Sequence, residues 1–259
     1  MKYFFFDYDG TFLIPRTPAM SERNREALLA LKKAGHKVIL CTGRCNGHVP
    51  DELWDLDLDA YCTSCGACII ADGKVIRDDR LDNGFVNETM KYFWDLQLDG
   101  AVEGEKRIKF YNIESYDKPK IPDVHSYDEY IRLYSLIPVH KLTLYGVPMK
   151  EDVAEYLVSN GLEIINNNNV YYEIIKAGND KGRAVRDTLR YFGADVMDSY
   201  CFGDSMNDSR MLMNVGHSMV VDSAPDDVKE MADEIIPSVY DDGPAIWIEN
   251  FLKESSPCL

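Results

Sequence analysis

Two acidic residues near the start of the chain have the spacing of a catalytic pair. Asp7 and Asp9 flank Tyr8 and are followed by Gly10 and Thr11. A carboxylate can attack an electrophile or transfer a proton, so two carboxylates this close can divide those tasks. An isolated acidic loop is more often a solvated turn, and Asp9 alone would fit that description.

Three further segments carry groups suited to the same chemistry: Thr42-Gly43-Arg44, Asp180-Lys181-Gly182, and residues 203–208 with Gly203, Asp204, Asn207 and Asp208. Carboxylates that converge repel one another unless a hard cation neutralises them, and oxygen ligands suit Mg²⁺. A lysine and a hydroxyl at the same place would hold an anion such as phosphate. Lys181 is informative because the helix dipole disfavours a cation at a helix start, and a bound anion would resolve that conflict.

The elements that must position these groups follow a βαβ pattern. Apolar runs at 4–6, 38–41 and 200–202 predict buried parallel strands, each ending at one of the reactive segments. A helix capped by Ser21 and ended at Gly35 joins the first two strands. Further predictions are helices over 182–191, 207–213, 225–231 and after Gly243, a strand over 218–221, and a hairpin turning at 72–73. Ligands of such sheets lie at the carboxyl ends of the strands, where these segments should meet.

The middle of the chain has a different character. We expect helices over 88–96, 127–136 and 151–159, strands over 107–111, 141–145 and around Ile164 and Tyr172, and a polar turn at 166–169. The sequence therefore predicts an α/β fold with a doubly wound, Rossmann-like parallel sheet core. Residues 1–81 and 178–259 form that core, and residues 82–177 form an inserted α+β cap domain.

Composition limits the partners. The 259 residues include 28 Lys and Arg against 44 Asp and Glu, a net charge of -16, which disfavours binding to nucleic acid or an anionic membrane surface. No run of about 18 apolar residues predicts a membrane span, and the absence of an export signal favours the cytoplasm. The oligomeric state stays open, and a monomer is compatible with the sequence.

The seven cysteines are expected to be free thiols. Cys62, Cys65 and Cys68 have the spacing that begins an iron–sulfur signature. The fourth ligand fails, because Asp72 stands where the last cysteine belongs. We therefore favour packing over metal binding for this cluster.

In order and spacing, the four reactive segments resemble the motifs of the haloacid dehalogenase-like (HAD) superfamily, and within it the Cof-type phosphatases. The segment at 7–11 is similar to the first motif (DxDGT), 42–44 to the second, 181–182 to the third, and 203–208 to the fourth (GDxxND). The predicted cap falls between the second and third motifs, as in that subgroup. The subgroup commonly has Asn-Gly-Ala where this chain has Cys65-Gly66-Ala67, so a ligand-gating role for that asparagine does not carry over.

The resemblance implies roles for individual residues. Asp7 would attack phosphorus and form an aspartyl-phosphate, and Asp9 would act as general acid and then general base. Mg²⁺ would be held by Asp7, the Asp9 backbone carbonyl and Asp204, with Asn207 and Asp208 in support. The implied catalytic residues are Asp7, Asp9, Thr42 and Lys181, and the implied phosphate-binding residues are Asp9, Gly10, Thr42, Gly43, Lys181 and Asn207. Arg44 would reach substrate or brace its loop.

The expected activity is Mg²⁺-dependent hydrolysis of a small phosphorylated metabolite, such as a sugar phosphate or related phosphomonoester. A phosphosugar mutase on the same scaffold and a noncatalytic phosphometabolite-binding module are the alternatives. The intact Asp7 and Asp9 disfavour the second of these. Candidate cap contacts to the substrate are Lys109, His125, Lys141 and Lys176.

Overall fold

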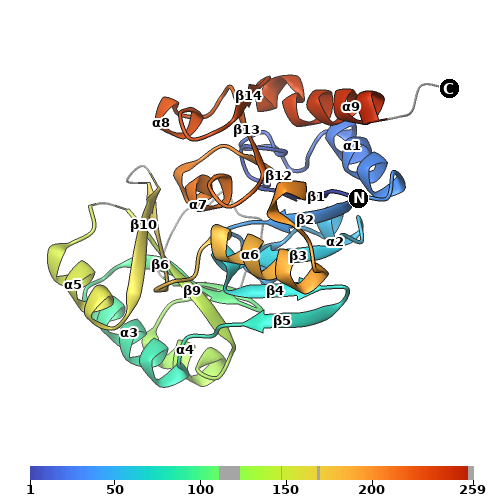
Figure 1. Ribbon diagram of the computed structural model, residues 1–259. Helices are drawn as coiled ribbons and strands as arrows, with labels where there is room; N and C mark the ends of the chain where they lie inside the picture. The colour runs from blue at the N-terminus through green and yellow to red at the C-terminus, as the bar shows by residue number, and fades with distance from the viewer. Residues whose placement is uncertain (111–122, 147, 168–169, 256–259) are drawn as a thin grey trace.

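Two β-sheets organise the chain in the computed structural model, which describes residues 1–110, 123–146, 148–167 and 170–255 (Figure 1). Among these residues the large sheet has eight strands, in the spatial order β14 (Glu234–Ile236), β13 (His217–Val221), β12 (Ser199–Gly203), β1 (Tyr3–Phe6), β2 (Lys37–Cys41), β3 (Ala60–Thr63), β4 (Cys68–Ala71) and β5 (Lys74–Asp78). The strands from β14 to β3 are parallel, and β3, β4 and β5 are antiparallel. The predicted α/β class is confirmed.

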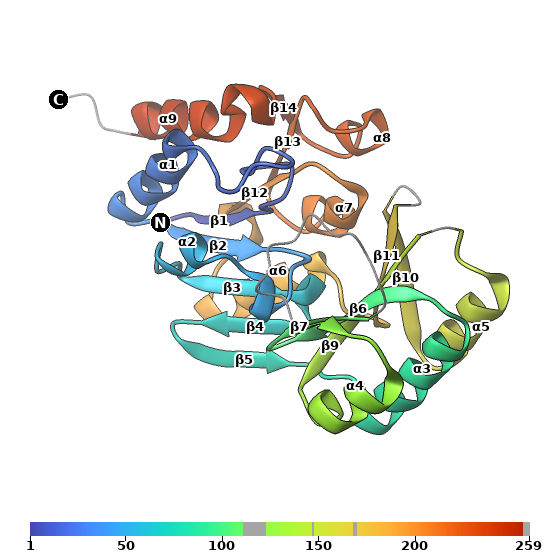
Figure 2. The same cartoon turned by 180° about the vertical axis from the view of Figure 1, so that it is seen from behind.

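Helices lie between the strands of the large sheet in sequence, and the last of them follows the final strand. They are α1 (Glu22–Lys33), α2 (Asp51–Trp54), α6 (Lys181–Phe192), α7 (Ser209–Leu212), α8 (Asp226–Lys229) and α9 (Gly243–Ser255). Short 3₁₀ turns are η1 (Asn46–His48), η2 (Ser64–Gly66), η3 (Val196–Asp198), η4 (Met206–Asp208) and η5 (Val239–Asp241). Ser21 caps α1 as predicted, because its side chain accepts the N–H of Asn24. Helix α6 lies in front of the sheet in Figure 1 and behind it when the molecule is turned (Figure 2).

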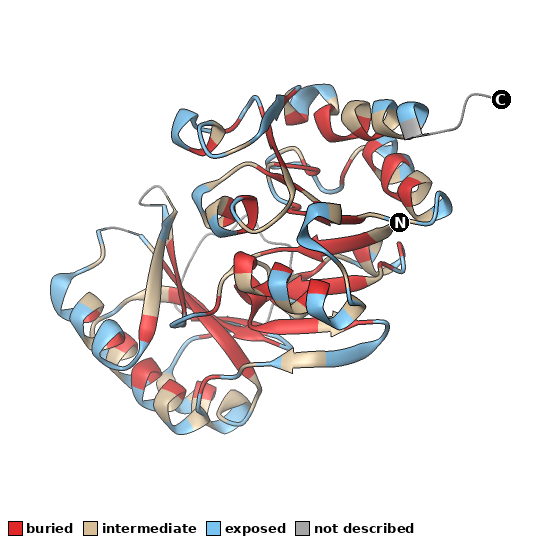
Figure 3. Ribbon diagram, viewed as in Figure 1, coloured by how far each residue is buried: buried red, intermediate tan, exposed pale blue. Residues whose placement is uncertain are grey.

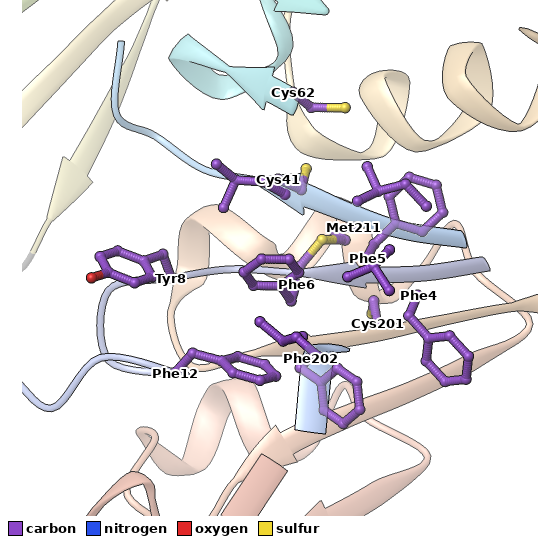
Figure 4. Packing of buried hydrophobic residues seen from close by; sticks show 14 of the residues in the cluster. Phe4, Phe5, Phe6, Tyr8, Phe12, Cys41, Cys62, Cys201, Phe202 and Met211 are labelled. Atoms are coloured by element: carbon purple, nitrogen blue, oxygen red, sulfur yellow. The ribbon is translucent and has the colours of Figure 1, made fainter. Parts of the chain in front are cut away.

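The core of the large sheet combines aliphatic side chains with a group of aromatic rings around β1. Figure 4 shows Phe4, Phe5 and Phe6 of β1 among their neighbours. Phe12 is fully buried, and its ring lies 5.0 Å from that of Phe6 and 5.7 Å from that of Phe202. Phe12 therefore anchors the loop that begins at Asp7, which makes the first reactive segment part of the packed core.

The small sheet lies between residues 99 and 176. Its described strands have the spatial order β10 (Leu162–Asn167), β11 (Tyr171–Lys176), β9 (Val139–Tyr145), β6 (Asp99–Gly104), β7 (Arg107–Phe110) and β8 (Asp123–Val124). Its helices are α3 (Asn83–Asp95), α4 (Tyr127–Tyr134) and α5 (Glu151–Ser159), which lie on the side away from the large sheet (Figure 1). The division of the chain at residues 81 and 177 stays a prediction.

The two faces of the small sheet differ in chemistry. Val102, Leu142 and Ile174 pack in an apolar cluster with the helices, for example with Phe93 of α3. The residues beside them in sequence alternate to the opposite face, because successive side chains of a strand point in opposite directions. Both faces are buried along the central strands (Figure 3). The second face is polar and is described with the site below.

Several elements differ from the sequence-based expectations. The helix predicted over 207–213 is instead η4 followed by α7, because Ser205 and Asp208 form a capping box that tightens the first turn. Strands β3, β6 and β14 and helix α2 were not expected. Strand β6 contains Gly100 and Gly104, which disfavour strands, but pairing with β7 and β9 on both sides outweighs that preference. Residue 111 of the expected strand and residues 168–169 of the expected turn lie outside the described residues.

No helix in the described part of the chain is long and apolar enough to cross a membrane.

Candidate active site

The ends of three adjacent strands carry most of the predicted site residues. Asp7 follows β1, Asp204 follows β12 and Thr42 follows β2, and these strands are parallel neighbours. The Asp7 N–H donates to the Phe202 carbonyl at 3.0 Å, which joins the first and fourth motifs. The strand order therefore brings residues far apart in sequence to one edge.

Lys181 is the first residue of α6 and is 1% exposed. Its Nζ donates to Asp7 Oδ1 at 2.7 Å and to Asp208 Oδ1 at 2.6 Å. Burial would lower the pKa of Lys181, but the charges of Asp208 and Asp7 raise it well above its usual value. The side chain is therefore a buried ammonium, and a mere surface charge at a helix start is excluded.

Asp208 is fully buried and has both oxygens engaged. While Oδ1 accepts from Lys181, Oδ2 accepts the backbone N–H groups of Asp204 at 3.0 Å and Ser205 at 3.1 Å. These contacts fix the turn after β12 and the position of Lys181 together. Asp208 thus contacts Lys181 directly, and its supporting role for a metal stays a prediction.

Asp7, Asp204 and Asp208 each offer an oxygen within 4.8 Å of the others. We call these residues together with Lys181 the sheet-edge cluster. Thr11 Oγ1 donates to Asp204 Oδ1 at 2.8 Å. Gly10 has a φ of +85°, and a Cβ there would overlap the Asp204 carboxylate, so glycine permits this close approach.

The negative charges of the three carboxylates in the cluster are not balanced by the one positive charge of Lys181. Burial raises the pKa of Asp7 well above its usual value, and burial together with the charge of Asp208 raises the pKa of Asp204 to about 7. A cation would replace those protons, and a set of carboxylate oxygens suits a hard divalent ion. The residues present therefore fit the predicted metal.

Asp9 lines the same cavity as Asp7 and Asp204, and its side chain pairs with Arg44. Its Oδ2 accepts from Arg44 Nε at 2.7 Å and its Oδ1 from Arg44 Nη2 at 2.6 Å. The guanidinium also lies 5.0 Å from the centre of the Tyr8 ring, and the Tyr8 hydroxyl donates to Glu52. Arg44 thus holds the side chain of the predicted general acid by both oxygens.

The remaining predicted residues lie at the same edge. Thr42 is 1% exposed, and its Oγ1 accepts the Arg44 N–H at 3.1 Å, which shapes the loop after β2. Gly43 and Asn207 line the cavity at this edge. Ser205 Oγ donates to Asn207 Oδ1 at 3.0 Å.

A cavity of about 500 Å³ lies between the two sheets at this edge, within the size range of small-molecule sites. The large sheet contributes Asp7, Asp9, Arg44, Asp204 and neighbours, and the polar face of the small sheet contributes Glu103, Arg107, Lys141, Thr143, Tyr145, Tyr171 and Glu173. Four of the side chains from the small sheet are both charged and buried: Glu103, Arg107, Lys141 and Glu173. We call them the cap-face network.

Of the four basic cap residues singled out from sequence, Lys141 lines this cavity and Lys109, His125 and Lys176 do not. Lys176 pairs instead with Asp79 at 2.6 Å. Glu103, Arg107 and Glu173 were missed by sequence reasoning. Alternation along the strand at 141–145 was a usable signal for Thr143, whereas Glu103 lies on a strand that the sequence did not predict.

The three clustered cysteines have separate environments. Cys62 Sγ contacts Thr188 Oγ1 at 3.3 Å, Cys65 Sγ donates to Glu173 Oε1 at 3.6 Å, and Cys68 Sγ accepts from Asn46 Nδ2 at 3.4 Å. Cys65 has a φ of 55°, in the left-handed region that asparagine tolerates better than most residues. The position that departs from the family pattern therefore faces the cap-face network.

The chain matches a known protein family and is similar to known proteins along most of its length. A family model described as haloacid dehalogenase-like hydrolase matches residues 4–248. The chain is similar to the 5-amino-6-(5-phospho-D-ribitylamino)uracil phosphatase YwtE of Bacillus subtilis (strain 168), with 26% identity over a 293-residue alignment covering 98% of this chain and 99% of the relative.

Two solved structures share the fold. The HAD subclass IIB sugar phosphatase BT4131 superposes with a TM-score of 0.81 at 24% identity, covering 97% of this chain and 99% of that one. A haloacid dehalogenase-like hydrolase from Bacteroides thetaiotaomicron gives a TM-score of 0.82 at 23% identity, covering 96% and 99%.

Proposed function

The chain belongs to the haloacid dehalogenase-like hydrolase family, and from that premise we propose that it is an Mg²⁺-dependent phosphatase of small phosphorylated metabolites, such as sugar phosphates or related phosphomonoesters. The observation that carries the proposal is Lys181, buried between Asp7 and Asp208 beside Asp204. An ammonium held by two of three neighbouring carboxylates, of which Asp7 and Asp204 line the cavity, suits the binding of a phosphoryl group and a cation together.

In the proposed mechanism an Asp7 oxygen attacks phosphorus while the bond to the leaving-group oxygen breaks, which forms an aspartyl-phosphate. Lys181, Thr42 and the backbone of Gly43 would hold the phosphoryl oxygens. Asp9 would give its proton to the leaving oxygen and then remove a proton from the water that hydrolyses the intermediate. Because Arg44 holds both Asp9 oxygens, Asp9 must exchange this partner for the leaving group before it can act.

The metal would be held by the Asp7 and Asp204 carboxylates and by the Asp9 backbone carbonyl. It would supply charge neutralisation to the transferring phosphoryl group. Asp208 and Asn207 would support this arrangement without contacting the ion, which agrees with the engagement of both Asp208 oxygens.

Residues 82–177 would act as a cap that closes over the phosphoryl site and excludes water. Support comes from the cavity, which takes its lining from both sheets. The leaving group of the substrate would then contact the polar face of the small sheet, and the phosphoryl group would contact the sheet-edge cluster.

The test is hydrolysis of a generic aryl phosphate with Mg²⁺ and with a chelator. We expect phosphate release that requires the metal. Folded protein that releases no phosphate from any phosphomonoester in a metabolite panel would contradict the proposal. An isomeric sugar phosphate formed with little inorganic phosphate would indicate a mutase instead.

A further inference from the structure

Lys141 occupies the centre of the cap-face network. Its Nζ donates to Glu173 Oε1 and lies 3.2 Å from Glu103 Oε2. Glu103 also pairs with Arg107 Nε at 2.9 Å and accepts from Thr143 Oγ1 at 2.6 Å. The two glutamates therefore flank one ammonium, and Arg107 supplies the second positive charge.

Glu173 extends this network to the large sheet. Its Oε1 accepts from Cys65 Sγ at 3.6 Å, and its Oε2 accepts from Asn167 Nδ2 at 3.3 Å. A Cβ at Gly43 would lie 2.8 Å from Glu173 Oε1, so the carboxylate reaches the loop that we propose binds phosphate. A group leaving phosphorus on this side must therefore pass close to Glu173.

Among the described residues, the two carboxylates of the network face two cations at the cavity wall. A hydroxyl can donate to one of the glutamates and accept from Lys141, so it can join the network without breaking an ion pair. A second anionic group would meet two fixed carboxylates and would have to displace one of them from a buried ammonium. Breaking a buried pair in this way is unfavourable, since it leaves an uncompensated charge.

We propose that Glu103, Lys141 and Glu173 form a specificity filter. The filter admits phosphomonoesters whose leaving group is neutral and hydroxyl-bearing, and it rejects those whose leaving group carries an anionic group. This inference rests on the proposed phosphatase function and specifies the charge of the leaving group that the enzyme accepts.

Matched substrate pairs test the filter on the wild-type protein. Glycerol 3-phosphate and 3-phosphoglycerate differ by a hydroxymethyl group against a carboxylate, as do sorbitol 6-phosphate and 6-phosphogluconate. We expect kcat/KM to favour the neutral member of each pair by at least about tenfold, which corresponds to about 1.4 kcal/mol. Equal turnover of the neutral and anionic members would overturn the inference.

The substitution Glu173→Gln keeps the size of the side chain and removes its charge. We expect it to lower the preference for the neutral member by about tenfold. Without the Glu173 charge, Lys141 is less fully neutralised and can pair with an anionic group of the substrate. Glu163→Gln is the matched control. Glu163 lies on neighbouring β10, pairs with Arg210 at 3.1 Å and does not line this cavity, so the preference should stay unchanged.

A preference that survives in Glu173→Gln, or that falls equally in Glu163→Gln, would also overturn the inference. If Glu173→Gln does not fold, as judged by circular dichroism, the wild-type preference alone decides. Hydrolysis of an aryl phosphate distinguishes a failure of the proposed phosphatase function from a failure of the specificity filter. Its absence with Mg²⁺ contradicts the proposed function, whereas its presence without discrimination within the pairs contradicts only the filter.

Discussion

The sheet-edge cluster and the cap-face network both contain buried charged side chains near one cavity, but they differ in the balance of carboxylates and cations. Asp7, Asp204 and Asp208 face a single cation, Lys181, in the first. Two carboxylates face two cations in the second, Glu103 and Glu173 against Lys141 and Arg107. Among the described residues, the first arrangement has fewer cations than carboxylates and calls for a further cation, whereas carboxylates and cations are equal in number in the second.

The pKa values of the buried carboxyl groups express the same difference. Burial raises the pKa of Asp7 well above its usual value, even though Lys181 opposes the rise. Burial would also raise the pKa of Glu103, but Lys141 and Arg107 outweigh it, and the pKa is lowered. Burial thus gives opposite outcomes, because Asp7 has three carboxylates and one ammonium nearby, whereas Glu103 has two cations beside it.

The largest effect is expected from Asp7→Asn in the sheet-edge cluster. Asparagine is nearly isosteric but a far poorer nucleophile, so kcat with an aryl phosphate should fall at least about a thousandfold. Circular dichroism should show an unchanged fold. Mg²⁺-dependent turnover close to the wild-type rate would contradict the proposed role of Asp7.

Removing the central cation of the cap-face network should instead lower the stability of the folded protein. Lys141→Met leaves Glu103 and Glu173 without their shared partner, and we expect a loss of about 3–5 kcal/mol in the free energy of unfolding. Chemical denaturation measures this. Lys91→Met is the control, because Lys91 forms an exposed pair with Asp95 and its removal should leave stability nearly unchanged. Equal stability of the two variants would contradict a tightly coupled network.

The sequence predicted the sheet-edge cluster better than the cap-face network, for a physical reason. Asp7, Thr42 and Asp204 follow short apolar strands, and parallel strands end at one edge whatever their exact register. The contacts of Lys141 depend on how β6, β9 and β11 align, and a shift of one residue would turn its side chain to the other face.

Two features of the site lay beyond sequence reasoning altogether. Glu103 could not be predicted to line the site, because Gly100 and Gly104 disfavour a strand and no strand was predicted there. The pairing of Asp9 with Arg44 depends on side-chain torsions of two loops, which no local pattern encodes. The meeting of the reactive segments at one sheet edge, by contrast, followed from the βαβ pattern and the ends of the apolar runs.

A smaller effect on stability should come from Mg²⁺, and it should depend on pH. The pKa of Asp204 is about 7 in the folded chain against 3.8 for the free group, so the folded metal-free protein binds more protons between those values. Its stability therefore falls as pH rises through this window and stays low above it. Mg²⁺ binding to the charged carboxylates should raise Tm by about 5–10 °C above pH 7, with the ion at a hundred times Kd, and by less at pH 5. Thermal unfolding with Mg²⁺ and with a chelator at both pH values checks this, and equal increases would contradict it.

The most direct test of the central claim is the mass of the protein during turnover. In Asp9→Asn the general base is absent, while an aryl leaving group needs little help from a general acid, so the phosphoenzyme should accumulate. Acid-quenched protein should gain the mass of one phosphoryl group, located by peptide mapping to Asp7. Folded Asp9→Asn that releases the aryl alcohol and phosphate at a steady rate without any phosphorylated Asp7 would contradict the account.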